Sequence, residues 1–148
     1  MPLILPDPLL PFQDQQPVTL LACAVFGEAR GQVQEAKVAV GCVIRNRAAL
    51  APRYGKGISG VILHPHAFSS FLPRDPNRNK MLNPLKCECE ETWAACYGIA
   101  DDVFNWRVPD PTQGSTHYFD DSIPAPYWAK DMVFKVKIGR LNFYRELP

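Results

Sequence analysis

Apolar residues recur at helical spacing in three stretches of the chain. The first covers residues 17–30, begins with a proline suited to a first helical turn, and ends at Gly31. The second covers residues 33–50 and should pack against the first. The third begins at Asn83-Pro84, a capping residue followed by a first-turn proline. Its apolar stripe comprises Leu85, Cys89, Trp93, Cys96 and Ala100. We therefore expect three main helices.

Short alternating segments fill the C-terminal part of the chain. Residues 116–119 suit a short strand, and residues 134–138 alternate apolar and basic side chains, which predicts a half-exposed strand. Residues 139–142 would make the turn to a partner strand at Phe143-Tyr144. Loops are expected in the segments rich in proline, glycine or polar residues, namely 52–60, 73–83 and 120–127. The pattern indicates an α+β fold, mainly helical, with a small antiparallel sheet.

The composition fits one folded domain. Of the 148 residues 47% are hydrophobic and 21% charged, and a net charge of +1 gives no global electrostatic argument for nucleic acid or membrane. The first seventeen residues contain five prolines and match neither a signal peptide nor a membrane span, because no positively charged region precedes an uninterrupted apolar core. We expect residues 1–17 to form a proline-rich arm laid over a single monomeric domain, residues 18–148.

The spacing of cysteine and histidine argues against a metal site. Cys23 and Cys42 lie in apolar helical runs and are expected to be small buried hydrophobes. The other cysteines lack the two-plus-two spacing of a structural zinc site; they are Cys87, Cys89 and Cys96. His64 and His66 are separated by a proline and have no third ligand nearby. We therefore expect reduced thiols, no metal and no cofactor.

Glu28 stands at the end of the first predicted helix. It shares a helical face with Val18, Leu21 and Val25. The carboxylate could pair with Arg30 or another cation near the helix end, as surface carboxylates usually do. Alternatively, desolvation raises the pKa of the carboxyl, which is how a glutamate becomes a general acid near neutral pH. Periodicity alone leaves both interpretations open.

Several separated motifs resemble those of the bacterial spore cortex-lytic and cell-wall hydrolase family. The first is Gly27-Glu28-Ala29-Arg30-Gly31, followed by Val38-Ala39-Val40 and Val43-Ile44-Arg45-Asn46-Arg47. Later matches are Phe68-Ser69, the segment 110–119 that begins Asp110-Pro111-Thr112, and Ile138-Gly139 with Phe143-Tyr144. The chain departs from the family pattern at Leu141, where histidine is usual, and at Gln32, where an acidic residue is common.

The resemblance implies a lysozyme-like domain in which helices surround a cleft and the small sheet lies beside it. It implies peptidoglycan glycan strands as the substrate, cut between N-acetylmuramic acid and N-acetylglucosamine, with Glu28 as the catalytic acid. Side chains expected to bind the sugars are Phe68, Ser69, Asp110, Thr112, Gly114, Thr116, His117 and Tyr118. We expect one of the two aromatic residues Tyr118 and Phe119 to be a plain core residue.

The reaction class depends on a second carboxylate. Standard glycosidases use two, and none stands out here among the candidates Glu35, Asp110, Asp120 and Asp121. A lytic transglycosylase needs only one acid, because the C6 hydroxyl of the muramic acid attacks, and this is the mechanism we favour. A hydrolytic muramidase is the alternative, and a non-catalytic glycan-binding module is the second alternative.

The resemblance also implies that the protein acts on the bacterial cell wall. Because residues 1–17 do not read as a signal peptide, we expect delivery either as a phage lysin made in the host cytoplasm or through a leader that this chain lacks.

Overall fold

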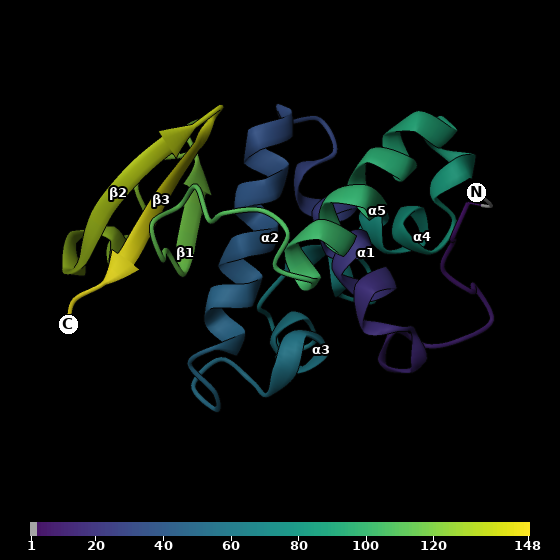
Figure 1. The fold of residues 1–148 in the computed structure, drawn as a ribbon, viewed down its shortest axis with the longest axis horizontal. Coiled ribbons are helices and arrows are strands. Elements are labelled where there is room, and N and C mark those ends of the chain that lie inside the picture. The colour runs from purple at the N-terminus through teal and green to yellow at the C-terminus, as the bar shows by residue number, and fades with distance from the viewer. Residues whose placement is uncertain (1–2) are drawn as a thin grey trace.

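Helices and strands occupy opposite ends of the molecule in the computed structural model, which describes residues 3–148 (Figure 1). The helices are α1 (Pro17–Ala29), α2 (Gln34–Ala48), α3 (Gly57–Ile62), α4 (Pro76–Leu82) and α5 (Glu90–Phe104). The strands are β1 (His117–Asp120), β2 (Met132–Ile138) and β3 (Leu141–Glu146). The short 3-10 turns include η1 (Phe12–Asp14), η2 (Ser69–Phe71), η3 (Pro84–Lys86) and η4 (Tyr127–Asp131). This arrangement confirms the predicted α+β class, mainly helical with a small antiparallel sheet.

Helix α1 lies at the centre of the helical part and is buried around its whole circumference. Every residue from Leu20 to Phe26 has an exposed fraction of 0%. The apolar stripe that leads to Glu28 is therefore one side of a helix that is apolar on all sides, as expected for a central core helix. Glu28 follows the fully buried stretch of α1, and its side chain is only half-buried.

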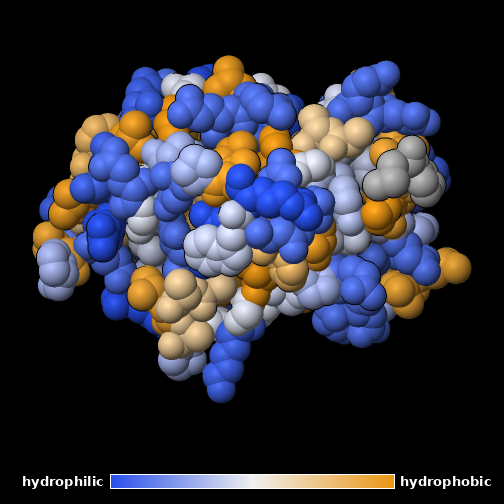
Figure 2. Space-filling model, viewed as in Figure 1, coloured by the Kyte–Doolittle hydropathy of each residue, from blue (hydrophilic) through white to orange (hydrophobic). Residues whose placement is uncertain are grey.

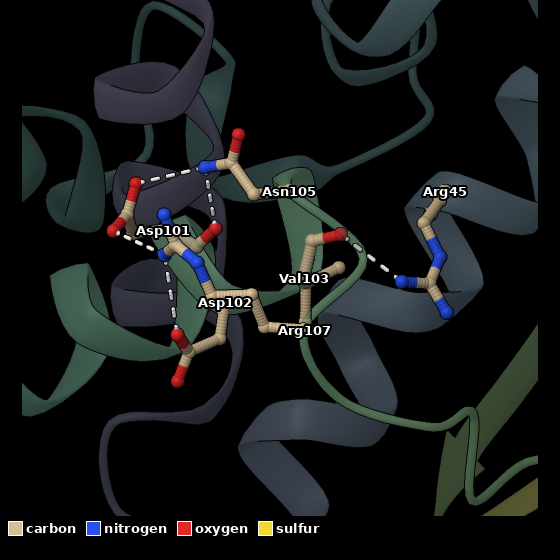
Figure 3. A network of polar contacts seen from close by, with 6 residues as sticks. All are labelled: Arg45, Asp101, Asp102, Val103, Asn105 and Arg107. Carbon is tan, nitrogen blue, oxygen red and sulfur yellow. Dashed lines mark hydrogen bonds and ion pairs between the residues drawn. The ribbon is translucent and has the colours of Figure 1, made fainter.

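Helix α2 lies between the helical part and the sheet (Figure 1). Towards the helices, the buried Arg45 donates a hydrogen bond of 3.0 Å to the Val103 carbonyl near the end of α5, as Figure 3 shows. Its guanidinium group also lies 3.8 Å from the Trp106 ring centre. Towards the sheet, Val40 and Val43 of α2 belong to a second apolar cluster that includes Phe143. The helix thereby fixes the sheet relative to α1.

The sheet has the order β1-β3-β2, with both strand pairs antiparallel. Register shifts between Phe134 and Val136, so Lys135 forms a bulge in β2. Simple alternation across residues 134–138 is therefore wrong: Val136 packs towards the α2 side, whereas Phe134 is 51% exposed and contacts the Tyr144 ring. Leu141, at the position where histidine was expected, is buried in the cluster between α2 and the sheet.

Three predictions for the middle of the chain were wrong. Residues 73–83 contain helix α4, which begins at Asp75-Pro76 with the Asp75 carboxylate accepting a hydrogen bond from the Asn77 amide. The third helix begins only at Glu90, since Asn83-Pro84 starts the short turn η3 instead. Leu85 and Cys89, the first two members of the predicted stripe, are accordingly exposed. The predicted loop 52–60 likewise ends in α3.

The N-terminal arm, defined here as residues 3–16, lies along the helical end of the molecule (Figure 1). Met1 and Pro2, also part of the predicted arm, are outside the described residues. The Trp93 indole donates a hydrogen bond of 2.7 Å to the Ile4 carbonyl, and Phe12 is buried in the main core. On the face shown in Figure 2, apolar side chains are visible along the arm at the right and over the sheet at the left. Across residues 3–148, no helix combines the length and apolar character needed to cross a membrane.

Candidate active site

Glu28 is held by two neutral hydroxyl donors, one on each carboxylate oxygen. The Tyr118 phenol, on β1, donates to Oε1 at 2.7 Å, and the Ser70 hydroxyl, on η2, donates to Oε2 at 3.3 Å. Burial raises the pKa of the Glu28 carboxyl above its ordinary value, and the two hydrogen bonds and the charge of Arg47 offset part of this effect. Asp75 adds to the rise in pKa through like-charge repulsion. Glu28 therefore keeps its proton to higher pH than an exposed glutamate.

Arg30 does not pair with Glu28. Its guanidinium group donates to the Phe26 carbonyl at 3.2 Å and to the Asn77 side chain at 3.0 Å, and it lies 3.5 Å from the Glu88 carboxylate. These contacts join the end of α1 to α4 and to the segment before α5. The first of the two interpretations was an ion pair of Glu28 with Arg30 or another cation near the helix end. It is wrong for Arg30, whose guanidinium group is bound elsewhere, and no ion pair within residues 3–148 involves Glu28.

Gly27 explains how η2 and α4 approach α1 closely enough to reach Glu28. A Cβ atom at this position would lie 2.6 Å from the Met81 sulfur and 3.0 Å from the Ser70 hydroxyl oxygen. Both neighbours are almost completely buried, so neither has room to move aside. The glycine before the glutamate is thus required by close packing, and that packing brings the Ser70 hydroxyl to the carboxylate.

The last residues of α2 hold the segment that leads into β1. The Asn46 amide donates to Asp110 at 2.8 Å and to the Ser115 carbonyl at 2.9 Å, while Arg47 Nε donates to the Thr116 carbonyl at 2.6 Å. The motif at residues 43–47 therefore has a structural explanation. Arg45 binds α5, and the next two residues bind the segment that leads into the strand carrying Tyr118.

Asp110 organises the turn before β1. Its carboxylate accepts hydrogen bonds from the Thr112 amide at 2.7 Å, the Thr112 hydroxyl at 2.6 Å and the Gly114 amide at 2.9 Å. Although burial raises the pKa of the Asp110 carboxyl, these bonds and that from Asn46 hold it below its ordinary value. Gly114 has a φ of +83°, a backbone conformation that side chains with a Cβ disfavour. The turn sets the position from which the Tyr118 side chain reaches Glu28.

Comparison with known proteins identifies the family. A sequence model described as Cell Wall Hydrolase matches residues 31–144, more than half of the chain. The chain belongs to the cell wall hydrolase family. The matched range begins three residues after Glu28, so the assignment of Glu28 depends on its own geometry and on the motif around it.

The proteins similar in sequence to this chain include spore cortex-lytic enzymes. The Bacillus subtilis enzyme is 30% identical over 121 residues, which cover 80% of this chain and 35% of the relative. The Bacillus cereus enzyme is 32% identical over 129 residues, which cover 87% of this chain and 44% of the relative. The chain thus spans less than half the length of these relatives.

Two solved structures share the fold. The catalytic domain of the germination-specific lytic transglycosylase SleB from Bacillus anthracis has a TM-score of 0.67 and 26% identity, covering 87% of this chain and 93% of that domain. The catalytic domain of the Bacillus cereus SleB protein has a TM-score of 0.67 and 28% identity, covering 87% and 89%.

The predicted sugar-binding residues separate into distinct groups in this cell wall hydrolase domain. Tyr118 meets Glu28, whereas Ser69 is exposed and its neighbour Ser70 makes the contact with the acid. Phe68 is buried, with its ring centre 5.5 Å from the Arg47 guanidinium carbon. Phe68 therefore packs beneath the site.

The remaining candidates lie in the turn or on the outer sheet face. Thr112 and Thr116 were predicted to bind sugars, but they are only 0% and 2% exposed in this conformation. The Thr112 hydroxyl is hydrogen-bonded within the turn, and the Thr116 hydroxyl is hydrogen-bonded to the His117 ring. Asp110 and Gly114 build the same turn. His117 packs against Trp128, with ring centres 5.0 Å apart, and burial lowers the pKa of its imidazole to about 4. Phe119 also contacts Trp128 and is half-buried, and the Tyr118 hydroxyl bonds Glu28. Neither is therefore the plain core residue that one of the two was expected to be.

Sequence reasoning missed three residues of the site. Ser70 was overlooked in favour of the adjacent serine, and no local signal separates the two. Arg47 was known only as part of a motif. Asp75 carried a recognisable signal, since Asp-Pro is a helix start of the same kind as Asn83-Pro84. Among residues 3–148, no group of three His, Cys, Asp or Glu side chains is placed to hold a metal ion.

Proposed function

We propose that this domain cleaves the glycosidic bond between N-acetylmuramic acid and N-acetylglucosamine in peptidoglycan, as a lytic transglycosylase with Glu28 as its single acid and base. The observation that carries the proposal is a half-buried carboxyl group with a raised pKa, whose hydrogen-bond donors within residues 3–148 are two neutral hydroxyl groups. Membership of the cell wall hydrolase family and the fold shared with a lytic transglycosylase catalytic domain support the same substrate and reaction.

In the first step the protonated Glu28 donates its proton to the glycosidic oxygen as the bond from that oxygen to C1 of the muramic acid breaks. The N-acetylglucosamine side leaves with a new hydroxyl group. The resulting Glu28 carboxylate is stabilised by the hydrogen bonds from Tyr118 and Ser70. Burial raises the pKa of the Tyr118 phenol well above its ordinary value, so this hydroxyl remains a donor throughout the working pH range.

In the second step the C6 hydroxyl of the muramic acid attacks C1, and Glu28 takes the proton of that hydroxyl. A 1,6-anhydro ring closes, and Glu28 ends in the protonated state in which it began. No water and no second carboxylate take part, which agrees with the fact that most of the candidate second acids already have partners. Asp110 is saturated by its turn, Asp120 and Asp121 pair with Arg140, and Glu35 is exposed in the first turn of α2.

A hydrolytic muramidase is the second candidate, and one residue favours it. Asp75 is the carboxylate whose charge acts on Glu28, and it stands at the start of α4 beside the site. In a hydrolase it would position and deprotonate the attacking water. One Asp75 oxygen already accepts the Asn77 amide, which leaves the other oxygen for this role.

Analysis of released muropeptides tests the proposal. Purified peptidoglycan is digested with the wild-type domain, and the products are examined by mass spectrometry. Terminal 1,6-anhydromuramic acid supports the transglycosylase. Reducing ends, heavier by one water, would instead assign hydrolysis, and Asp75→Asn should then abolish turnover. Binding to peptidoglycan without release of any fragment would overturn both and indicate a glycan-binding module.

A further inference from the structure

The N-terminal arm is packed as a part of the domain and contacts it at two points. At its start, the Ile4 carbonyl accepts the hydrogen bond from the fully buried Trp93. At its end, Phe12 in η1 is 4% exposed and lies edge-on to Phe71 of η2, with ring centres 4.8 Å apart. The arm therefore meets both the core beneath α1 and the element that carries Ser70.

The arm has an internal structure that keeps Phe12 in place. The side chain of Gln15, which is 8% exposed, donates to the Asp7 carbonyl at 2.7 Å and to the Leu10 carbonyl at 3.2 Å. Its side-chain oxygen also accepts a hydrogen bond of 3.1 Å from the Asp7 backbone amide. A buried amide with these three bonds folds the proline-rich segment into a compact loop, which lowers the freedom that Phe12 would have on an open chain.

Phe12 lies between η2 and α4, two of the elements that act on the Glu28 carboxyl. On one side is Phe71, whose neighbour Ser70 is 1% exposed and donates to Glu28. On the other side the Arg78 guanidinium carbon of α4 lies 5.1 Å from the Phe12 ring centre. Helix α4 begins at Asp75, the carboxylate that raises the pKa of Glu28.

We propose that the arm is a positioning element of the active site: Phe12 fixes η2 through Phe71 and so holds the Ser70 hydroxyl on Glu28. Phe12 touches neither the carboxyl nor a sugar, and it acts only through these neighbours. The inference depends on the proposed role of Glu28. It adds that a segment outside the residues matched by the family sequence model contributes to the catalytic geometry.

The test compares Phe12→Leu and Phe12→Ala with Leu9→Ala. Leu9 lies in the same arm and is 91% exposed, so it controls for changes in the arm that do not reach η2. We expect both Phe12 variants to lower kcat on purified peptidoglycan by about 10- to 100-fold, the range for a small displacement at a catalytic group, with Ala worse than Leu. Leu9→Ala should match the wild type.

The pH profile separates positioning from simple loss of stability. Losing the Ser70 hydrogen bond removes a contact that favours the ionised carboxylate, so the alkaline limb of the rate should move to higher pH in the Phe12 variants. Ser70→Ala should move it in the same direction, and Phe12→Leu should then add no further shift in that background. Circular dichroism at the assay temperature identifies the folded variants, and Phe12→Leu is used if Phe12→Ala unfolds.

A folded Phe12→Leu variant with wild-type kcat and an unmoved alkaline limb would overturn the positioning role while leaving Glu28 as the acid. A limb that moves equally in the presence and absence of the Ser70 hydroxyl would also overturn it, because the effect would then bypass η2. Failure of the proposed function has a different result: the Glu28→Gln variant would retain turnover whatever the state of the arm.

Discussion

Tyr118→Phe is the substitution that most directly tests the acid. It removes the shorter of the two hydrogen bonds to Glu28, the 2.7 Å bond to Oε1, and leaves the ring that packs against Phe143. A hydrogen bond to a charged group stabilises by about 1.5–3 kcal/mol net. That contribution is made to the ionised carboxylate, which forms as the proton is transferred to the leaving oxygen.

Losing this hydrogen bond should have two effects: a lower plateau rate and a wider alkaline range of activity. The plateau rate should fall roughly 10- to 100-fold, since each 1.36 kcal/mol lost from the stabilisation of the transition state is about tenfold in rate. At the same time the pKa of Glu28 should rise further, because its ionised form has lost a donor. The alkaline limb of the rate profile should therefore move to higher pH, and the variant would be slower but active over a wider alkaline range.

The assay is the initial rate of clearing of a cell-wall suspension, measured across pH with product analysis at the plateau. Tyr54→Phe is the matched control, because the Tyr54 hydroxyl also donates to a carboxylate, that of Glu146. It should leave the alkaline limb in place. A Tyr118→Phe limb that stays fixed or moves to lower pH would refute the reasoning, whatever happens to the plateau rate.

Three further predictions concern single positions. Glu28→Gln should lower activity by at least about 100-fold. It should also raise the free energy of unfolding at neutral pH, because a carboxyl with a raised pKa destabilises the fold where it is ionised. This gain should shrink as the pH falls through the raised pKa of Glu28 and be lost below the ordinary glutamate value of about 4.3. Chemical denaturation at two pH values checks the sign, and a variant that clears walls at the wild-type rate would remove Glu28 from the mechanism. His117→Asn should leave the alkaline limb unmoved, since an imidazole with a pKa of about 4 is already neutral there; loss of the limb would transfer the role to His117. Gly114→Val should destabilise the fold by about 1–3 kcal/mol because of the φ of +83°, and an unchanged melting temperature would contradict this.

Local patterns predicted the elements whose ends carry strong signals. The helix that carries Glu28 and the helix that carries residues 43–47 were found within a few residues of their true bounds. For the first, a proline start, a glycine stop and an apolar run all agreed; for the second, the apolar periodicity sufficed. Helix α4 was missed because seven residues with one buried side chain, Met81, leave almost no periodicity. The β2 bulge was missed because an inserted residue changes the facing of a strand without changing its composition.

The active site was harder to predict than the elements, because its contacts join residues that are far apart in the sequence. Glu28 and Tyr118 were identified from motifs, but their contact joins residues 90 positions apart. It depends on the turn at Asp110 and on the hydrogen bonds that Asn46 and Arg47 donate to the segment before β1. The choice between Ser69 and Ser70 was decided by the direction of a single 3-10 turn. Asp110 and Thr112 were expected to face sugars, but their side chains form hydrogen bonds with each other and with the backbone of the turn.

The complete burial of α1 has a consequence for how this protein loses activity. Amides in a helix with no exposed side exchange with solvent only when the surrounding structure opens, so α1 should be among the slowest-exchanging segments in hydrogen–deuterium exchange. Glu28 is carried by that helix, two residues beyond its fully buried stretch, so its position should be lost late in unfolding. Its two hydroxyl donors are carried by less protected elements, a short turn and an edge strand. Heating should consequently loosen the donors first, so that activity declines while the exchange protection of α1 is still intact.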